Sequence, residues 1–473
     1  MFGLWLLIPE HLRLGTWDLL NTWSNGNGEK EEQVKQVTGM NSRLAMQLIN
    51  EASLCVPGVR EKSTLSQKGF ELANGLPFVA SDEAIHHMLS SHTILESQRL
   101  QIALGKIRLT FGHFKGKLLA IDPHRVRTYS KRQMIRRKKD IDSKPCKMAQ
   151  TFFCLDADTK QPICFTTGTA ARNVTKATPE LLQLASTILN ISNSSSSSKS
   201  KKKNVKDTGK GKSKGKSKGK GKGKGKGNEK EPGKEKKVLV LADNEHYTRE
   251  LMDWIFTESP FDMLVPMQNK ISLKKQLKTI PVRAFKTHWA GYATTVIEYH
   301  MKDSSCGPFY EFIQRSGERP QDYDYNSFLC TSNRDGGEMK DMAFSFPQRW
   351  HIEEFFKNDQ ALGWNRFGTM NLNIQFGKMT MSLFAQAAIH MMRQRLGKPY
   401  AIWDAQHLAK DFFKAIEGDI RVQNDTIIVT FYNPPNARML KRNYENLPGQ
   451  LEEEDCNPRI PWLYDYKIDF RFK

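Results

Sequence analysis

The chain has 473 residues, a formal net charge of +21 and seven cysteines. This length allows two or three domains with substantial hydrophobic cores, and the positive charge points to a polyanionic partner. The cysteines form no CxxC pair, which argues against a disulfide framework or a zinc knuckle. No run of about 18 apolar residues is present, so we expect a cytoplasmic protein with no membrane partner.

Most of the charge lies in one low-complexity segment. Residues 199–237 contain 18 Lys and four acidic residues, so they carry +14 of the net charge and leave +7 for the rest of the chain. The whole segment 192–237, Ser-rich and then Lys/Gly-rich, has almost no apolar surface to offset chain entropy, and we expect it to be disordered. It separates a helix from a strand, which indicates an insertion. Two roles stay open: a tether along nucleic-acid phosphates, and a solvated loop.

Residues 1–112 have the spacing of several helices and contain no catalytic motif. Apolar residues recur at helical intervals within 31–55 and 81–104, and Ser81 is a candidate N-cap. We therefore expect an all-α N-terminal domain. It is either a DNA-binding module or a helical domain that only packs on the rest of the chain.

Strand patterns begin in the next segment, 113–191. The apolar run Leu118 to Ile121 ends at Asp122, and a basic turn that contains Arg125 and Arg127 follows it. An acidic residue at the carboxyl end of a buried strand is common at the sites of open sheets, although it also occurs as a turn former. Further elements are expected as strands at 148–155 and 162–167 and as a helix at 179–189.

The same pattern returns after the insertion, in the core segment 238–269. Here the apolar run Val238 to Ala242 ends at Asp243. The following residues, 270–345, are aromatic and β-rich, and we interpret them as a small β subdomain inserted in the core. Expected elements are a helix at 246–256 and strands at 263–266, 281–285, 292–299, 309–314 and 328–332.

A third acidic residue, Glu353, lies on a helix expected in the core segment 346–397. Ser345 and Gln348 have the spacing of a capping box. One face of this helix would carry Phe346, Arg349, Glu353 and Gln360. A second, amphipathic helix is expected at 379–396. The C-terminal region, 398–473, is expected to hold a helix at 404–416 and a hairpin that turns at Asn424 and Asp425, with no readable role.

Two strand-end aspartates and a helical glutamate are the groups that a two-metal phosphoryl-transfer site needs. Two Mg²⁺ ions about 4 Å apart activate a nucleophile and stabilise the leaving group, and Mg²⁺ prefers carboxylate oxygens. We expect Asp122 to bridge two Mg²⁺ ions and Asp243 and Glu353 to complete the set, with Mn²⁺ as an alternative ion. Arg349, one turn before Glu353, is suited to hold a phosphate, and Arg125 and Arg127 are further candidate DNA contacts.

This order of elements resembles the DDE transposases of bacterial insertion sequences, in the branch with a β-rich insertion and a Y-x2-R-x3-E-x6-K signature. The resemblance covers about 115–396 and is most specific around Arg349 and Glu353, within the segment RWHIEEFF. It implies an α/β fold with a ribonuclease-H-like catalytic core and the same three metal ligands. The implied activity is cleavage of transposon ends and transfer of the 3′-hydroxyl to target DNA.

The resemblance also implies partners and roles. The partners would be the terminal inverted repeats and the target DNA, bound by a homodimer in a synaptic complex, in a bacterial, nucleoid-associated setting. Phe346 and Gln360 replace the Tyr and Lys of the signature, so Lys357 becomes the substitute phosphate contact. Trp289 is a candidate for stacking on a flipped base, although a tryptophan buried in a β core is the favoured interpretation.

Two rival functions remain open. One is a ribonuclease-H-fold DNA nuclease or resolvase that lacks strand transfer. The other is a catalytically retired transposase that acts as a DNA-binding protein.

Deletion of residues 199–237 tests the tether. We expect weaker non-specific DNA binding and a flatter salt dependence, because each phosphate contact contributes about −0.9 to the log-log slope, while catalysis is spared. Fluorescence anisotropy at several salt concentrations measures both quantities. An unchanged slope would mean that the segment does not contact phosphates.

Overall fold

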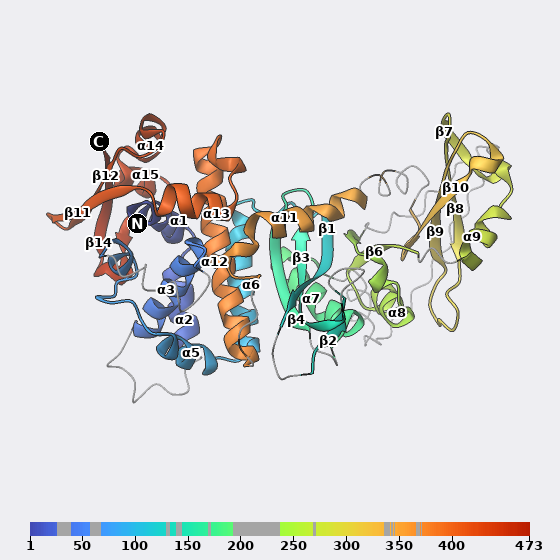
Figure 1. Cartoon of the computed structure of the whole chain (residues 1–473), viewed down its shortest axis with the longest axis horizontal. Helices are drawn as coiled ribbons and strands as arrows, with labels where there is room; N and C mark the ends of the chain where they lie inside the picture. The colour runs from blue at the N-terminus through green and yellow to red at the C-terminus, as the bar shows by residue number, and fades with distance from the viewer. Residues whose placement is uncertain are drawn as a thin grey trace, which may run out of the picture.

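The computed structural model describes residues 1–25, 39–56, 68–128, 133–138, 144–168, 172–192, 237–267, 271–334, 341, 344, 346–365, 369 and 371–473. Nearly all of the expected insertion at 192–237, and the expected cap residue Ser345, therefore lie outside the described residues. The fold is elongated, and both chain ends lie in the same end lobe (Figure 1). No helix in these ranges is long and apolar enough to cross a membrane.

A mixed sheet runs through the described part of the chain in the order β2-β3-β1-β5-β6-β10-β9-β8-β7, and β4 also pairs with β3. Strands β1, β5 and β6 are parallel, whereas β3 is antiparallel to β1. The strands are β1 Leu118–Arg127, β2 Ile135–Arg137, β3 Cys146–Asp156, β4 Gln161–Gly168, β5 Val238–Leu241, β6 Phe261–Pro266, β7 Lys286–Trp289, β8 Tyr292–Tyr299, β9 Phe309–Ser316 and β10 Asp324–Cys330.

Helices surround this sheet and form most of the lobe that holds the two termini. The principal ones are α1 Ile8–Arg13, α2 Thr16–Asn25, α3 Met40–Ser53, α4 Lys68–Ala73, α5 Asp82–Ser90, α6 Ile94–Thr110, α7 Val174–Leu189, α8 Arg249–Thr257, α9 Ile271–Lys278, α11 His351–Asp359, α12 Leu372–Leu396, α13 Ala405–Leu408, α14 Ala437–Tyr444 and α15 Leu447–Glu453. Short 3-10 helices include η1 Phe2–Leu7, η4 Asn244–His246 and η7 Phe346–Trp350.

Side chains alternate between the two faces of the sheet, as pleated strands require. Ile121 and Phe152 point into a core that is shared with α7 and α8. Ala120 and Phe153 point the opposite way, into a core that includes α11 and α12. Since helices cover both faces, the central strands are apolar along most of their length, which is the pattern that made them recognisable in the sequence.

The β-rich region after residue 270 extends the central sheet. Strand β10 pairs with β6, so that Leu329 lies opposite Val265. The outer strands also enclose a small core of their own, which includes Phe285 and Ile313. The segment expected to be a separate β subdomain is therefore continuous in hydrogen bonding with the core. It begins with a helix, α9, where the sequence pattern indicated only β structure.

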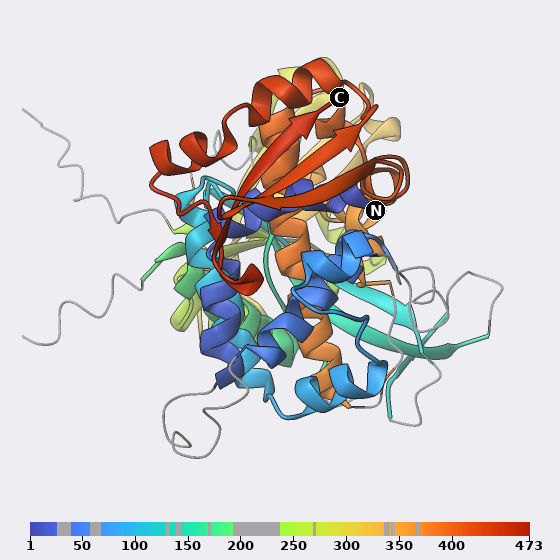
Figure 2. The ribbon, with the colours of Figure 1, turned by 90° about the vertical axis from the view of Figure 1, so that its left-hand side faces the viewer.

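The N-terminal helices and the C-terminal region share one hydrophobic core. A second sheet, in the order β11-β12-β14-β13, lies in this lobe, and 3-10 helix η1 packs against it (Figure 2). Trp5, Leu44, Phe384 and Phe431 all belong to the same buried cluster. The expected boundary near residue 112 thus does not separate two cores. The strands of this sheet are β11 Glu417–Gln423, β12 Thr426–Tyr432, β13 Arg459–Ile460 and β14 Tyr466–Phe472.

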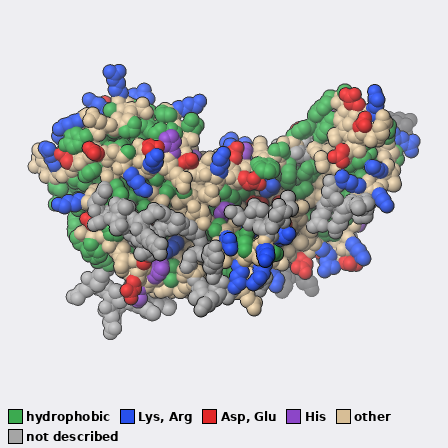
Figure 3. Space-filling view, viewed as in Figure 1, with side chains coloured by type: hydrophobic (Ala, Val, Ile, Leu, Met, Phe, Trp, Pro, Cys, Tyr) green, Lys and Arg blue, Asp and Glu red, His purple; other side chains and the backbone are tan. Residues whose placement is uncertain are grey.

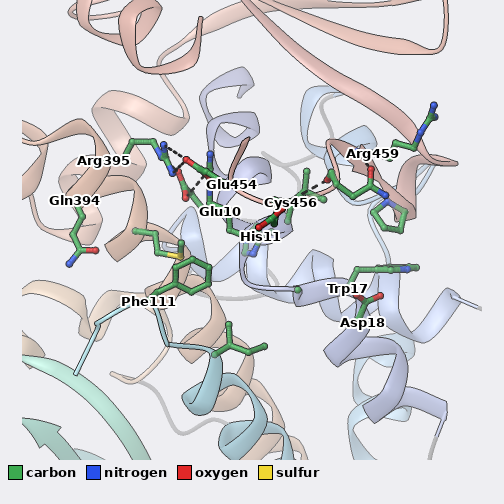
Figure 4. A pocket seen from close by; sticks show the side chains of 18 of the residues that line it. Glu10, His11, Trp17, Asp18, Phe111, Gln394, Arg395, Glu454, Cys456 and Arg459 are labelled. Atoms are coloured by element: carbon green, nitrogen blue, oxygen red, sulfur yellow. Dashed lines mark hydrogen bonds and ion pairs between the residues drawn. The ribbon is translucent and has the colours of Figure 1, made fainter. Parts of the chain in front are cut away.

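Four buried or partly buried charges tie this lobe to α12. Glu10 is fully buried; its carboxylate lies 3.3 Å from Arg13 and 3.1 Å from Arg395. Glu454 also contacts both arginines. Burial raises the pKa of Glu10, against the opposing effect of Arg13 and Arg395. The network borders a cavity of about 1050 Å³ (Figure 4). Its two carboxylates and two guanidinium groups pair mainly with one another.

Replacing Arg395 by Met tests this network. We expect the free energy of unfolding to fall by about 3 kcal/mol, because removing one partner leaves a buried carboxylate incompletely compensated. The control is Arg459→Met at the same cavity, where the arginine pairs with exposed Asp425 and the expected loss is at most about 1 kcal/mol. Urea unfolding monitored by tryptophan fluorescence distinguishes the variants. Equal losses would contradict the prediction.

Candidate active site

The register of β1 and β5 aligns the two predicted aspartates. Ala120 lies beside Leu241 in this parallel pair. Asp122 is two residues further along β1, and Asp243 lies two residues beyond Leu241, the last residue of β5, in extended backbone at the start of η4. Because side chains alternate along extended backbone, both leave the same face as Ala120 and Leu241. This is the face toward α11. The carboxylates of Asp122 and Asp243 are partly buried, with 18% and 22% of each side chain exposed.

Close placement of two acidic groups makes their ionisation unequal. Burial, and then the charge of Asp243, raise the pKa of Asp122 to about 7, although Arg349 opposes the shift. Burial also acts to raise the pKa of Asp243, but a hydrogen bond from His246 and the charges of His246 and Arg349 hold it below its usual value. A positive charge near Asp122 and Asp243 therefore favours their ionised forms. The effect is largest for Asp122, because its pKa is the one that is raised.

Arg349 connects this pair to the third predicted carboxylate. Its Nη1 lies 3.1 Å from Asp122 Oδ1, and its Nη2 lies 3.9 Å from Glu353 Oε1. Arg349 stands in η7 and Glu353 in the first turn of α11, so the expected single α-helix is tightened into a 3-10 segment at its start. The four residues expected on one helix face are thus not on a single α-helix, and Gln360 lies beyond the end of α11.

Several contacts hold α11 over the sheet. His351 Nδ1 donates a hydrogen bond to the carbonyl of Ala157 at 2.7 Å, and Phe356 stacks on His124 of β1. Lys160 pairs with Glu354 at 2.6 Å. Because Glu354 faces this surface lysine, it is turned away from the aspartates. Lys357, the substitute phosphate contact, is exposed one turn beyond Glu353.

Strand β1 is longer than its sequence indicated, and this separates the predicted DNA contacts. The strand passes through Asp122 and continues to Arg127, because β3 offers pairing partners over that whole length. Arg125 and Arg127 stand three and five residues after Asp122, so their side chains leave the opposite face. Arg125 contacts Glu245 and, at 3.2 Å, Gln150. Arg125 therefore contacts none of the three carboxylates directly, although its charge lowers the pKa of Asp122.

Trp289 is on the surface. It is 50% exposed and stacks on Tyr292 with a centroid separation of 4.3 Å, and the ring of Phe344 lies 5.7 Å from it. The favoured interpretation of a buried core tryptophan was therefore wrong: Trp289 ends β7, which is an edge strand of the sheet formed by the described residues. Phe344 precedes Arg349 by five residues, so their Cα atoms are at most about 18 Å apart.

Sequence reasoning missed two structural residues here. His246 is buried, and its Nδ1 donates to Asp243 Oδ1 at 2.6 Å; the signal was its position three residues after Asp243, across the 3-10 turn η4. Asp156 is also buried and accepts four backbone N–H bonds, among them those of Lys115 and Gly116 at 2.7 Å each. Asp156 therefore organises the β3–β4 turn.

The spacing of Asp122, Asp243, Glu353 and Arg349 determines how a cation or a phosphate could bind at this site. Within the described ranges, no three His, Cys, Asp or Glu side chains are grouped closely enough to hold a metal ion as they stand. Asp122 and Asp243 are adjacent, whereas the guanidinium of Arg349 lies between Asp122 and Glu353. Both hydrogen bonds of Asp243 use Oδ1, and no described residue is bonded to its Oδ2.

No family model matches this chain, and no curated protein matches it in sequence. Among solved structures, it is similar to a chain of a piggyBac transposase synaptic complex with hairpin DNA, with 10% sequence identity and a TM-score of 0.39. The match covers 88% of this chain and 80% of that chain. The comparisons do not place the chain among bacterial insertion-sequence transposases.

Asp156→Ala should destabilise the protein without touching the aspartate pair. We expect a loss of about 2–4 kcal/mol, since several buried N–H groups lose a charged acceptor. Asp158→Ala in the same turn is the control, because Asp158 is exposed, and its expected change is within about 0.5 kcal/mol. Thermal unfolding measures both. A loss below 1 kcal/mol for Asp156→Ala would contradict this role.

Proposed function

We propose that the chain is a metal-dependent DNA transposase of the DDE type, which cleaves transposon ends and transfers the 3′-hydroxyl to target DNA. The observation that carries the proposal is the proximity of Asp122, on β1, to Asp243, which follows the adjacent parallel strand β5, with Arg349 reaching from Asp122 toward Glu353. Acidic groups with strongly perturbed pKa values occur preferentially at functional sites, and Asp122 is such a group.

The donor set fits Mg²⁺ in kind, with Mn²⁺ as an alternative. Asp122, Asp243 and Glu353 would offer carboxylate oxygens. Burial and the charge of Asp243 raise the pKa of Asp122, so a cation bound beside it would favour its ionised form. Two such ions would supply an activated nucleophile and a stabilised leaving oxygen. The chain's own part is to bring the two aspartates together through the pairing of β1 with β5 and to fix Asp243 through His246.

Other residues would hold the DNA. Arg349 can form a charge-assisted fork with a phosphate when its guanidinium leaves Asp122. Lys357 is exposed on α11, and the half-exposed ring of Trp289 would stack on a base. The proposal includes a homodimer that pairs two terminal inverted repeats on target DNA. It also includes a location in the bacterial nucleoid. The sequence resemblance implies both.

We also propose a ribonuclease-H-like core within this α/β chain. Its support is the strand order β4-β3-β1-β5-β6, in which β1, β5 and β6 are parallel, with helices on both faces. The proposal of the bacterial insertion-sequence branch rests on the order of these elements in the sequence and most specifically on the RWHIEEFF segment. The nuclease or resolvase without strand transfer shares this geometry, so only an assay that starts from a pre-cleaved 3′ end separates the two.

Asp122→Asn and Asp243→Asn test the catalytic proposal. We expect each change to lower Mg²⁺-dependent cleavage of DNA flanking the reading frame by more than about 100-fold, since even outer-shell partners of a metal typically contribute 10–100-fold. Duplex binding in EDTA should stay unchanged, which separates the site from a DNA-binding role.

Glu354→Gln is the matched control, because Glu354 is adjacent to Glu353 but pairs with Lys160. It should keep near-normal cleavage. Unaltered cleavage by Asp122→Asn would refute the site. Cleavage without joining of a pre-cleaved end would favour the nuclease, and binding without any cleavage by the unmodified chain would favour the retired transposase.

A further inference from the structure

The C-terminal sheet ends in a long edge strand. Within the described residues, β11 pairs with β12 on one side and with no strand on the other. Its seven residues, Glu417–Gln423, include no proline and pair with β12 without a register shift. The strand lies at the outer end of the lobe that holds both termini (Figure 1). Its outer side can therefore pair with a further strand.

The other edge strands of the two described sheets are short or covered. Strand β7 has four residues and pairs irregularly with β8, and β13 has two residues. Strand β2 has three residues, and every residue of β4 is buried. Short strands, irregular pairing and burial are common protections against edge-to-edge pairing. Strand β11 has none of these three, so among the described edges it is the best suited to a partner strand.

The turn of the hairpin decides which backbone groups of β11 face outward. Asn424 and Asp425 both have positive φ, which is typical of a two-residue turn that closes on a hydrogen-bonded pair, here Gln423 and Thr426. Hydrogen-bonded and non-hydrogen-bonded pairs alternate along an antiparallel ladder. The residues whose N–H and C=O groups point away from β12 are therefore Gly418, Ile420 and Val422.

These three residues define one register for a second copy of the strand. Two β11 strands that pair in antiparallel fashion use all three outward-facing residues only when Ile420 lies opposite Ile420. Gly418 of each copy then lies opposite Val422 of the other. This arrangement has a twofold axis at Ile420, as a contact between identical patches requires.

The charges of β11 are complementary in that same register. Asp419 and Arg421 have side chains that are 31% and 70% exposed and lie 3.2 Å apart along the strand. With the axis at Ile420, Asp419 lies opposite Arg421 of the second copy, and the pair repeats on the other side of the axis. Opposite charges at directly facing positions stabilise a sheet. Acidic, basic and apolar side chains are interspersed at this end of the molecule (Figure 3).

The other face of the strand offers apolar surface to the same partner. Ile420 and Val422 leave the face opposite to the two charges. Ile420 packs at the border of the core, whereas Val422 is 59% exposed. In the paired register, Val422 of one copy lies beside Gly418 of the other, over which the ring of Phe2 packs. Pairing therefore buries apolar surface that the single chain leaves in solvent.

We propose that two copies of the chain associate through β11, in antiparallel fashion about a twofold axis at Ile420. Their C-terminal sheets then form one continuous sheet. This interface gives the homodimer of the proposed function a location, at the end of the molecule away from β1 (Figure 1). The role of the homodimer rests on the proposed function, but the pairing of the two strands does not.

The test is charge reversal at the two facing positions. Asp419→Arg and Arg421→Asp each place like charges across the axis, so we expect each to weaken self-association at least about tenfold. Sedimentation velocity of the full chain without DNA measures this association. The control is Lys410→Asp, a charge reversal at an exposed position outside β11, which should leave association unchanged. Circular dichroism confirms that each variant is folded.

Mixing the two single variants separates an interface from an effect within one chain. One variant carries two positive side chains at these positions and the other carries two negative ones, so an equimolar mixture should associate as strongly as the unmodified chain. The interface would be overturned by an unmodified chain that stays monomeric at about 100 µM, by single variants that associate normally, or by a mixture that associates no better than its components.

The interface and the catalytic proposal fail separately. The expected pattern of association in a chain that never cleaves DNA would retain the interface and reject the catalytic proposal. DNA cleavage by a chain that lacks this pattern would reject the interface and retain the catalytic proposal.

Discussion

The parallel pairing of β1 with β5 is the constraint on which the candidate site depends. It brings Asp122 and Asp243 close together where both are partly buried, and burial, together with the charge of Asp243, raises the pKa of Asp122. Two neighbouring residues contact these carboxylates. His246 donates to Asp243, and Arg349 reaches Asp122 from a different element. A pair of carboxylates with a perturbed pKa is suited to binding cations or to stabilising charge that develops during a reaction.

The position of Arg349 and Glu353 is set by helix packing at a distance from the carboxylates. The far end of α11 is held by Asp359, whose carboxylate lies 3.1 Å from Arg393 of α12. Helix α12 in turn packs on α3, α5 and α6, and Arg395 links it to buried Glu10. The terminal lobe therefore does more than cover the sheet, because it provides the rigid support for the helix that faces the aspartates.

The sequence pattern identified the acidic residues of the candidate site but not the structure around them. Apolar runs that end in Asp122 and Asp243 were recognisable because buried parallel strands need continuous hydrophobic residues. The extent of β1 was missed, since it depends on pairing with β3 beyond Asp122, and the alternation that follows places Arg125 and Arg127 on the other face. Trp289 was expected to be buried, because no local pattern reveals that β7 is an edge strand.

The sequence alone determined features that arise from neighbouring residues. The hairpin that turns at Asn424 and Asp425 is one, because both residues accept the positive φ that a tight turn needs. Only the tertiary structure decided which distant groups meet: Arg349 with Asp122, and the N-terminal helices with the C-terminal sheet. Local propensity acts over a few residues, whereas strand order and helix packing join segments hundreds of residues apart, and no short-range pattern encodes that choice.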